Sequence, residues 1–176
     1  GGDNIGITVN TKKILVVGFY KVDGKNIGFD SGVKIGDKIT HINNIEVNNI
    51  SELLSIMNKE ISNDSVKITV LRQEKPLNLD LKLIEDKNGV YKTGLYIKDQ
   101  ITGIGTLTYI DPNSKIYGAL GHEITNSTNN NIVEISGGNI FKAEVTGNTK
   151  STVTTTGEKN AVFYSNEIYG SINENT

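Results

Sequence analysis

Apolar and polar residues alternate over two neighbouring stretches in the first half of the chain. Residues 66–72 (VKITVLR) and 77–83 (LNLDLKL) share this two-residue period, and residues 73–76 (QEKP) separate them. Successive side chains of a strand point to opposite faces, so the pattern predicts two antiparallel strands that each bury one face. Residues 52–59 instead carry apolar side chains at helical spacing, and Ser51 before them predicts a helix N-cap.

Residues 31–43 (SGVKIGDKITHIN) follow the pattern Ser-Gly-Φ-x-Φ-Gly-Asp-x-Φ-x-x-Φ-Asn, in which Φ is apolar. Gly36-Asp37 predicts a tight turn, and we expect Ile39 and Ile42 after it to pack inward. His41 is expected to face solvent, because alternation places it opposite the buried positions. Ser31 belongs to the turn pattern, which favours a structural role over a nucleophilic one.

This pattern closely resembles the core of bacterial PDZ domains. The resemblance implies that an extended peptide binds as one more strand beside the helix, with its terminal carboxylate held by the backbone N–H groups of a Φ-Gly-Φ loop. The implied peptide-binding residues lie in that loop and on the helix: Ile5, Gly6, Ile7, Leu53, Ile56 and Met57. Plain core packing is the alternative interpretation of the apolar members.

Residues 103–124 (GIGTLTYIDPNSKIYGALGHEI) predict a β-hairpin that ends in a histidine. Residues 111–114 (DPNS) form a turn, because Asp can bond the backbone two residues on and Pro presets φ. Gly118 and Gly121 allow close backbone approach beside His122. Histidine titrates at about 6.5, so His122 can serve as general base for a serine hydroxyl. An incidental turn histidine is the alternative.

The segments GIGTLTY and YGALGH are similar to the catalytic-histidine segment of the SpoIVB peptidases, the stage IV sporulation serine proteases, and so is YKTGLYIKD at 91–99. The resemblance implies a mostly β fold with a small α+β part: a PDZ domain at 1–86, followed at 87–176 by the N-terminal part of a trypsin-like β-barrel. The polar residues 85–89 mark the boundary. His122 is implied as the catalytic base.

The family also implies a biological setting. We expect an extracytoplasmic serine endopeptidase of the forespore intermembrane space, which cleaves a regulatory protein partner and so triggers late sporulation sigma-factor processing. The implied ligand of the PDZ groove is a C-terminal peptide tail, self-cleavage and self-association remain open, and no cofactor or metal is implied. Any signal or anchor is expected to lie outside this chain.

Composition narrows the remaining functions. The 176 residues are 36% hydrophobic and 22% charged, with a formal net charge of −2, so a packed core is expected. No basic stripe is present and Arg72 is the single arginine, which argues against nucleic-acid binding. The absence of cysteine excludes disulfides and thiol catalysis. No apolar run reaches the ~20 residues of a membrane-spanning helix.

A serine protease also needs a nucleophile and an orienting acid. The sequence contains no Gly-x-Ser-Gly, and Ser171 lacks the flanking glycines that shape an oxyanion hole. We assign the acid to neither Asp99 nor Asp111. We therefore expect an N-terminal portion of a peptidase that is inactive alone. The alternative is a non-catalytic PDZ peptide-binding adaptor with a β-rich interaction domain; an HtrA-like protease is disfavoured because its PDZ domain follows the barrel.

Overall fold

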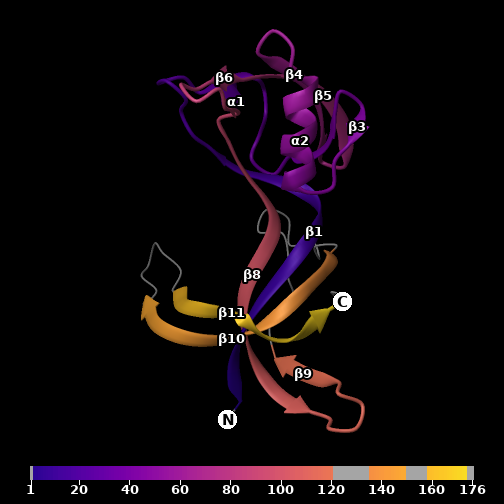
Figure 1. Ribbon diagram of the computed structural model, residues 1–176, viewed down its shortest axis with the longest axis vertical. Coiled ribbons are helices and arrows are strands. Elements are labelled where there is room, and N and C mark those ends of the chain that lie inside the picture. Colours follow the sequence, from indigo (N-terminus) through magenta and orange to yellow (C-terminus); the bar gives the residue numbers. More distant parts are fainter. Residues whose placement is uncertain (1, 121–134, 150–157, 174–176) are drawn as a thin grey trace. The chain divides into compact units, whose positions relative to one another are not determined.

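The computed structural model describes residues 2–120, 135–149 and 158–173 (Figure 1). The chain divides into two compact units, residues 12–99 (the central unit) and residues 1–11 together with 100–176 (the terminal unit). Strands β1 (Asp3–Phe19) and β8 (Leu95–Ile110) contribute residues to both units. The boundary that the sequence predicted at residue 86 lies inside the central unit and stays a prediction.

The central unit contains a small antiparallel sheet and two helices. Its further elements are α1 (Ile27–Asp30), β2 (Lys38–Ile42), β3 (Ile45–Glu46), α2 (Ile50–Glu60), β4 (Ser65–Arg72), β5 (Lys75–Lys82), β6 (Ile84–Glu85) and β7 (Tyr91–Lys92). The sheet runs in the order β1-β2-β4-β5. The predicted pair of alternating strands is confirmed as the β4–β5 hairpin. Gln73 and Glu74 in its turn have φ values of 50° and 60°, a conformation that matches the twist of the paired strands.

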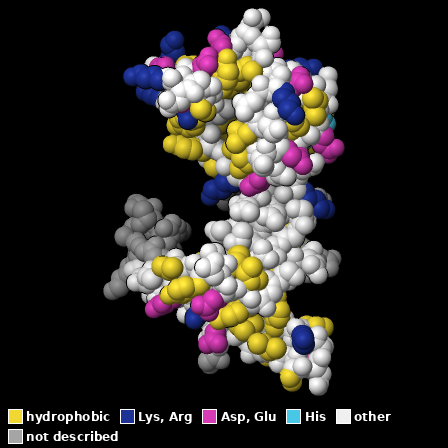
Figure 2. Space-filling model, viewed as in Figure 1, with side chains coloured by type: hydrophobic (Ala, Val, Ile, Leu, Met, Phe, Trp, Pro, Cys, Tyr) yellow, Lys and Arg dark blue, Asp and Glu magenta, His cyan; other side chains and the backbone are white. Residues whose placement is uncertain are grey.

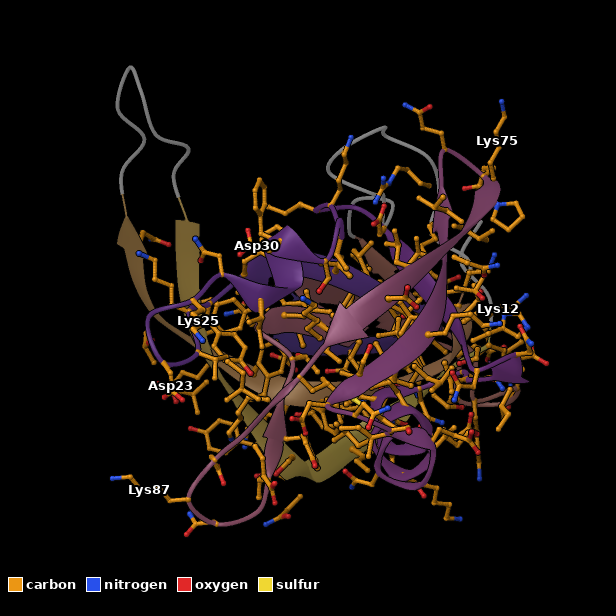
Figure 3. All side chains as sticks on the ribbon, turned by 90° about the horizontal axis from the view of Figure 1, so that it is seen from above. Lys12, Asp23, Lys25, Asp30, Lys75 and Lys87 are labelled. Carbon is orange, nitrogen blue, oxygen red and sulfur yellow. The ribbon has the colours of Figure 1, made fainter. Side chains whose placement is uncertain are left out.

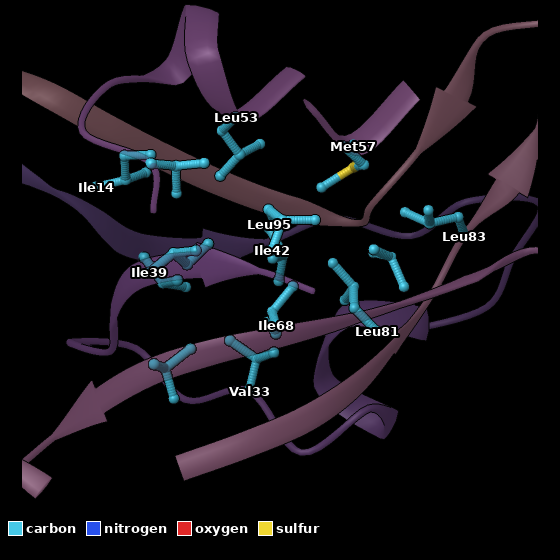
Figure 4. Close-up of a cluster of buried hydrophobic side chains, with 14 residues drawn as sticks. Ile14, Val33, Ile39, Ile42, Leu53, Met57, Ile68, Leu81, Leu83 and Leu95 are labelled. Atoms are coloured by element: carbon cyan, nitrogen blue, oxygen red, sulfur yellow. The ribbon is translucent and has the colours of Figure 1, made fainter. Parts of the chain in front are cut away.

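A hydrophobic core lies between helix α2 and the sheet (Figure 4). Ile39 and Ile42 are fully buried in it, as their spacing predicted. Leu53 and Met57 enter this core from the helix, and Leu95 enters it from the start of β8. Burial of one such side chain stabilises the fold by roughly 1.5–3 kcal/mol.

Helix α2 begins two residues earlier than the sequence suggested. Its N-cap is Asn49, whose side-chain oxygen accepts a hydrogen bond from the backbone N–H of Glu52 at 2.8 Å. The Glu52 carboxylate accepts in turn from the N–H of Asn48 at 2.9 Å. The prediction of Ser51 as N-cap was wrong: both residues have capping side chains, and only the backbone shows which one precedes the first helical turn.

One ion pair of the central unit is buried. Arg72 donates from Nε and Nη2 to the Asp37 carboxylate at 2.8 and 2.7 Å, and Asp37 is 1% exposed. The N–H of Lys34 donates to the same carboxylate at 2.9 Å, and Arg72 Nη2 also donates to the carbonyl of Gly32 at 2.8 Å. The single arginine of the chain therefore holds a turn in place. Other charged side chains, such as Asp23 and Lys75, project outward (Figure 3).

The terminal unit consists of long antiparallel strands. They are the first part of β1, the second part of β8, β9 (Tyr117–Leu120), β10 (Ile135–Thr149) and β11 (Glu158–Ile172). β1 pairs with β10 from Ile5 opposite Lys142 to Thr11 opposite Ile135. Among the described residues the strand order ends at β11, so these strands form an open sheet.

Local patterns in the second half of the chain predict short strands, with residues 161–165 and 168–172 as a final pair, but the terminal unit has long strands there. Residues 161–165 and 168–172 are not a pair but parts of one strand, β11, which follows β10 through several register shifts. The positions around Gly137-Gly138 likewise belong to the continuous β10. Bulges let a long strand bend without ending. A local sequence pattern does not distinguish such a bend from the end of a strand. The polar segment at 125–131 and the Thr-rich segment at 151–157 lie outside the described residues.

Candidate functional site

The predicted hairpin is confirmed. β8 and β9 pair antiparallel, with Ile110 opposite Tyr117 and Leu107 opposite Ala119. In the turn, the Asp111 carboxylate accepts from the N–H of Asn113 at 3.0 Å and from the hydroxyl of Ser114 at 2.5 Å. These two hydrogen bonds, the one from Ser114 first, lower the pKa of Asp111. Asp111 is thus explained by the turn.

The described part of the hairpin leads to the expected base but stops before it. His122 lies outside the described residues, and β9 ends at Leu120. The expected close approach of two backbone segments is not seen at Gly118, where a Cβ would instead meet the ring of Tyr109. The role of His122 therefore stays a prediction.

Ser171 and Asp99, to which the sequence assigned no catalytic role, both make hydrogen bonds within the fold. Ser171 lies within β11 opposite Asn139, and its carbonyl accepts a hydrogen bond from the Tyr117 hydroxyl at 3.1 Å. Asp99 lies in β8, where its carboxylate accepts from the N–H of Ile50 at 2.8 Å.

The expected carboxylate-binding loop is a strand. Ile5, Gly6 and Ile7 lie within β1 and pair with Lys142, Phe141 and Ile140 of β10. A Cβ at Gly6 would meet the ring of Phe163, so the close approach at this glycine is made by an aromatic side chain of the same unit. A Φ-Gly-Φ triplet fits a loop and a strand equally well, and here partner residues in β10, more than 130 positions away in sequence, select the strand.

The three helical residues of the expected groove differ in how deeply they are buried. Leu53 and Met57 are 1% and 3% exposed and belong to the core of the central unit, and Ile56 is half-buried against it. Leu53 and Met57 therefore pack as the alternative interpretation expected. Peptide binding by this face of α2 stays a prediction.

Two polar residues to which the sequence assigned no catalytic role, His41 as a solvent-facing residue and Ser31 as a turn residue, lie among the described residues. His41 lies in β2 and is half-buried, with Nδ1 at 2.8 Å from the hydroxyl of Thr40. The hydroxyl of Ser31 donates to the carbonyl of Ile27 at 2.7 Å and accepts from the N–H of Lys82 at 3.1 Å. The structural role predicted for Ser31 is confirmed.

The sequence analysis missed the contact between Asp99 and the first turn of α2. Residues 95–99 (LYIKD) alternate, with Leu95, Ile97 and Asp99 at least partly buried and Tyr96 and Lys98 exposed. This alternation could have predicted a strand at residues 95–99. It could not have predicted that the strand packs against helix α2.

In the described part of the chain, no group of three or more His, Cys, Asp or Glu side chains is placed to hold a metal ion. The described helices also include none whose length and apolar content would let it cross a membrane.

Comparison with known families defines the class of protein. Residues 4–83 match the model of the PDZ domain, so the chain is a PDZ-containing protein. Residues 89–176, half of the chain, match the model of SpoIVB peptidase S55. The chain belongs to the SpoIVB peptidase family, as its hairpin motifs suggested. A search of curated proteins gave no match.

Proposed function

We propose that this protein is a serine endopeptidase of sporulation in which His122 is the general base and the PDZ domain recognises peptides. The family match across residues 89–176 carries the proposal, because it includes His122 together with the confirmed β8–β9 hairpin.

The chemistry requires that His122 take a proton from a serine hydroxyl as it attacks the scissile carbonyl, and then return the proton to the leaving amine. Neutral imidazole is the reactive form, so activity is expected to rise as pH passes the ordinary histidine pKa of about 6.5. No serine of residues 1–176 is assigned as the nucleophile.

The family suggests the biological setting. We propose that the substrate is a regulatory protein partner whose cleavage starts late sigma-factor processing, and that the enzyme acts in the forespore intermembrane space. The PDZ domain would then hold a peptide tail of the substrate, or of a second copy of the enzyme, near the catalytic domain.

The test is cleavage of the protein partner in sporulating cells that carry His122→Ala in the gene for this protein. Loss of a general base is expected to lower the cleavage rate by about 10²–10⁴-fold. His41→Ala is the matched control, because it removes the other of the two histidines, and it should cleave like the unaltered protein. Full cleavage by the His122→Ala protein would overturn the proposal.

A second function is favoured by one observation, the absence of a Gly-x-Ser-Gly motif from the 176 residues. It is a non-catalytic PDZ adaptor in which the β-rich terminal unit is an interaction surface. The adaptor predicts that His122→Ala changes neither cleavage nor partner binding, whereas the peptidase predicts loss of cleavage with binding retained.

A further inference from the structure

The strand of the central unit that a PDZ ligand would extend already has a neighbour on each edge. One edge of β1 pairs with β2, with Ile14 opposite Ile39. β8 also pairs with β1, and the N–H of Tyr20 donates to the carbonyl of Gly94 at 3.0 Å. An ideal Cβ at Gly18 of β1 would lie 3.3 Å from the ring of Tyr96, so the first residues of β8 lie alongside this part of β1. A strand has only two edges, and a PDZ ligand adds as a strand to a free edge.

The same residues present alternate side chains to the core and to solvent. Leu95 is 6% exposed and shares the core cluster with Leu53 and Met57 of α2, as Figure 4 shows. Ile97, two residues on, packs against that cluster. Tyr96 between them is 55% exposed. Residues 95–97 therefore lie as an added strand whose inward side chains meet the helix.

A charged contact fixes the end of this segment. The Asp99 carboxylate accepts from the N–H of Ile50, the first residue of α2, at 2.8 Å. The first N–H groups of a helix have no partner within the helix, and its N-terminus favours negative charge. Asp99 thus places a carboxylate at the N-terminus of α2, a position different from the Φ-Gly-Φ loop at which the PDZ resemblance implies a terminal carboxylate.

We propose that residues 95–99 are a built-in ligand of the PDZ domain, and that an external peptide must displace them to bind. The inference rests on the peptide-recognition role in the proposed function and deepens it. The site then selects internal extended segments of the pattern Leu-x-Ile-x-Asp: two apolar side chains at alternate positions for the core, followed by an acidic side chain for the helix N-terminus. A free C-terminus is not required.

The probe is the hexapeptide Gly-Leu-Tyr-Ile-Lys-Asp, the sequence of residues 94–99, with a fluorophore at its N-terminus and an amidated C-terminus. Binding to the full chain is measured by fluorescence anisotropy. Asp99→Ala removes the charge-assisted contact of the internal strand, so the peptide is expected to bind this variant roughly tenfold more tightly than the unaltered chain. Asp80→Ala, which removes an exposed carboxylate of β5, is the matched control and should bind like the unaltered chain.

A second variant keeps the test independent of stability. The chain has no cysteine, and an ideal Cβ at Gly18 lies 3.8 Å from the Cβ of Tyr96, the separation typical of a disulfide. In Gly18→Cys/Tyr96→Cys the oxidised protein is expected not to bind the peptide, and the reduced form of the same protein is expected to bind it. A peptide that ends in Ala in place of Asp should bind roughly tenfold more weakly to the Asp99→Ala chain.

Equal binding by the oxidised and reduced forms, or equal affinity of Asp99→Ala and the unaltered chain, would overturn the proposal, and so would a failure of every variant to bind. These results do not depend on His122. A protein that cleaves its partner but fails the peptide test keeps the proposed catalysis and loses the built-in ligand; the reverse result removes the catalysis alone.

Discussion

Replacement of Arg72 by Ala removes the side chain that pairs with the buried carboxylate of Asp37. Three hydrogen bonds are lost at once, two to Asp37 at 2.7 and 2.8 Å and one to the carbonyl of Gly32 at 2.8 Å. Asp37 is left in a site that is 1% exposed, where the N–H of Lys34 still donates to it. An unpaired carboxylate in such a site is costly because the water that reaches the vacated position cannot replace all the hydrogen bonds of the guanidinium.

The expected loss of stability can be bounded from this geometry. Removal of one partner of a buried ion pair costs about 3–5 kcal/mol. The side chain of Arg72 is 25% exposed, so some water reaches the vacated position and the lower end, about 3 kcal/mol, is expected. Hydrogen bonding to Asp37 raises the pKa of Arg72, so the guanidinium stays charged over the whole range in which the protein can be studied.

The assay is urea unfolding followed through amide signals of residues 12–99. At a urea dependence of about 1–3 kcal/mol per molar, a loss of 3 kcal/mol lowers the midpoint by about 1–3 M. Lys38→Ala is the control, since it breaks the exposed pair of Lys38 with Glu74 at 3.1 Å and should cost at most about 1 kcal/mol. The reasoning is refuted if Arg72→Ala costs no more than Lys38→Ala.

Three further changes test other parts of the fold. Gly94→Ala should lower the stability of the central unit by about 1–3 kcal/mol in urea unfolding. The reason is that Gly94 has a φ of 70° and that a Cβ there would lie 3.1 Å from the carbonyl oxygen of Tyr20. A loss of stability below about 0.5 kcal/mol would contradict this reasoning. Asn49→Ala should cost about 1 kcal/mol and Ser51→Ala about 0–0.5 kcal/mol, and the opposite order would restore Ser51 as the N-cap. Hydrogen bonds from Val90 and Asn88 lower the pKa of Asp86, so its contribution to stability is present above the ordinary aspartate pKa and is lost as pH falls through the lowered value. Acid titration of the Asp86 carboxyl by NMR should show that lowered pKa, and a midpoint at or above the ordinary aspartate value would count against the turn.

Sequence reasoning succeeded where the deciding contacts are local. The β4–β5 hairpin, the inward packing of Ile39 and Ile42, and the β8–β9 hairpin with its Asp111 turn all follow from patterns within about 20 residues. Turn chemistry and side-chain alternation depend on residues within that range, so both can be predicted from the local sequence.

It failed where a distant segment decides. Ile5 pairs with Lys142, and no local pattern distinguishes a Φ-Gly-Φ loop from a Φ-Gly-Φ strand when the partner is so far along the chain. The same holds for Asp99, whose role depends on the N–H of Ile50. For Arg72, rarity was a signal: a single arginine in a lysine-rich chain marks a position that needs two-pronged hydrogen bonding, which lysine cannot provide.

The open sheet of the terminal unit affects how the protein must be handled. In the described part of the chain β11 pairs only with β10, and it carries exposed apolar side chains, among them Val162 and Ile168; Figure 2 shows such side chains gathered on this unit. A long strand with an unpaired edge is a template for another chain. Association through it would follow a two-fold axis, since each copy offers the same edge. Each affinity should therefore be measured at several protein concentrations, because pairing between two copies of the chain competes with any ligand that binds as an added strand.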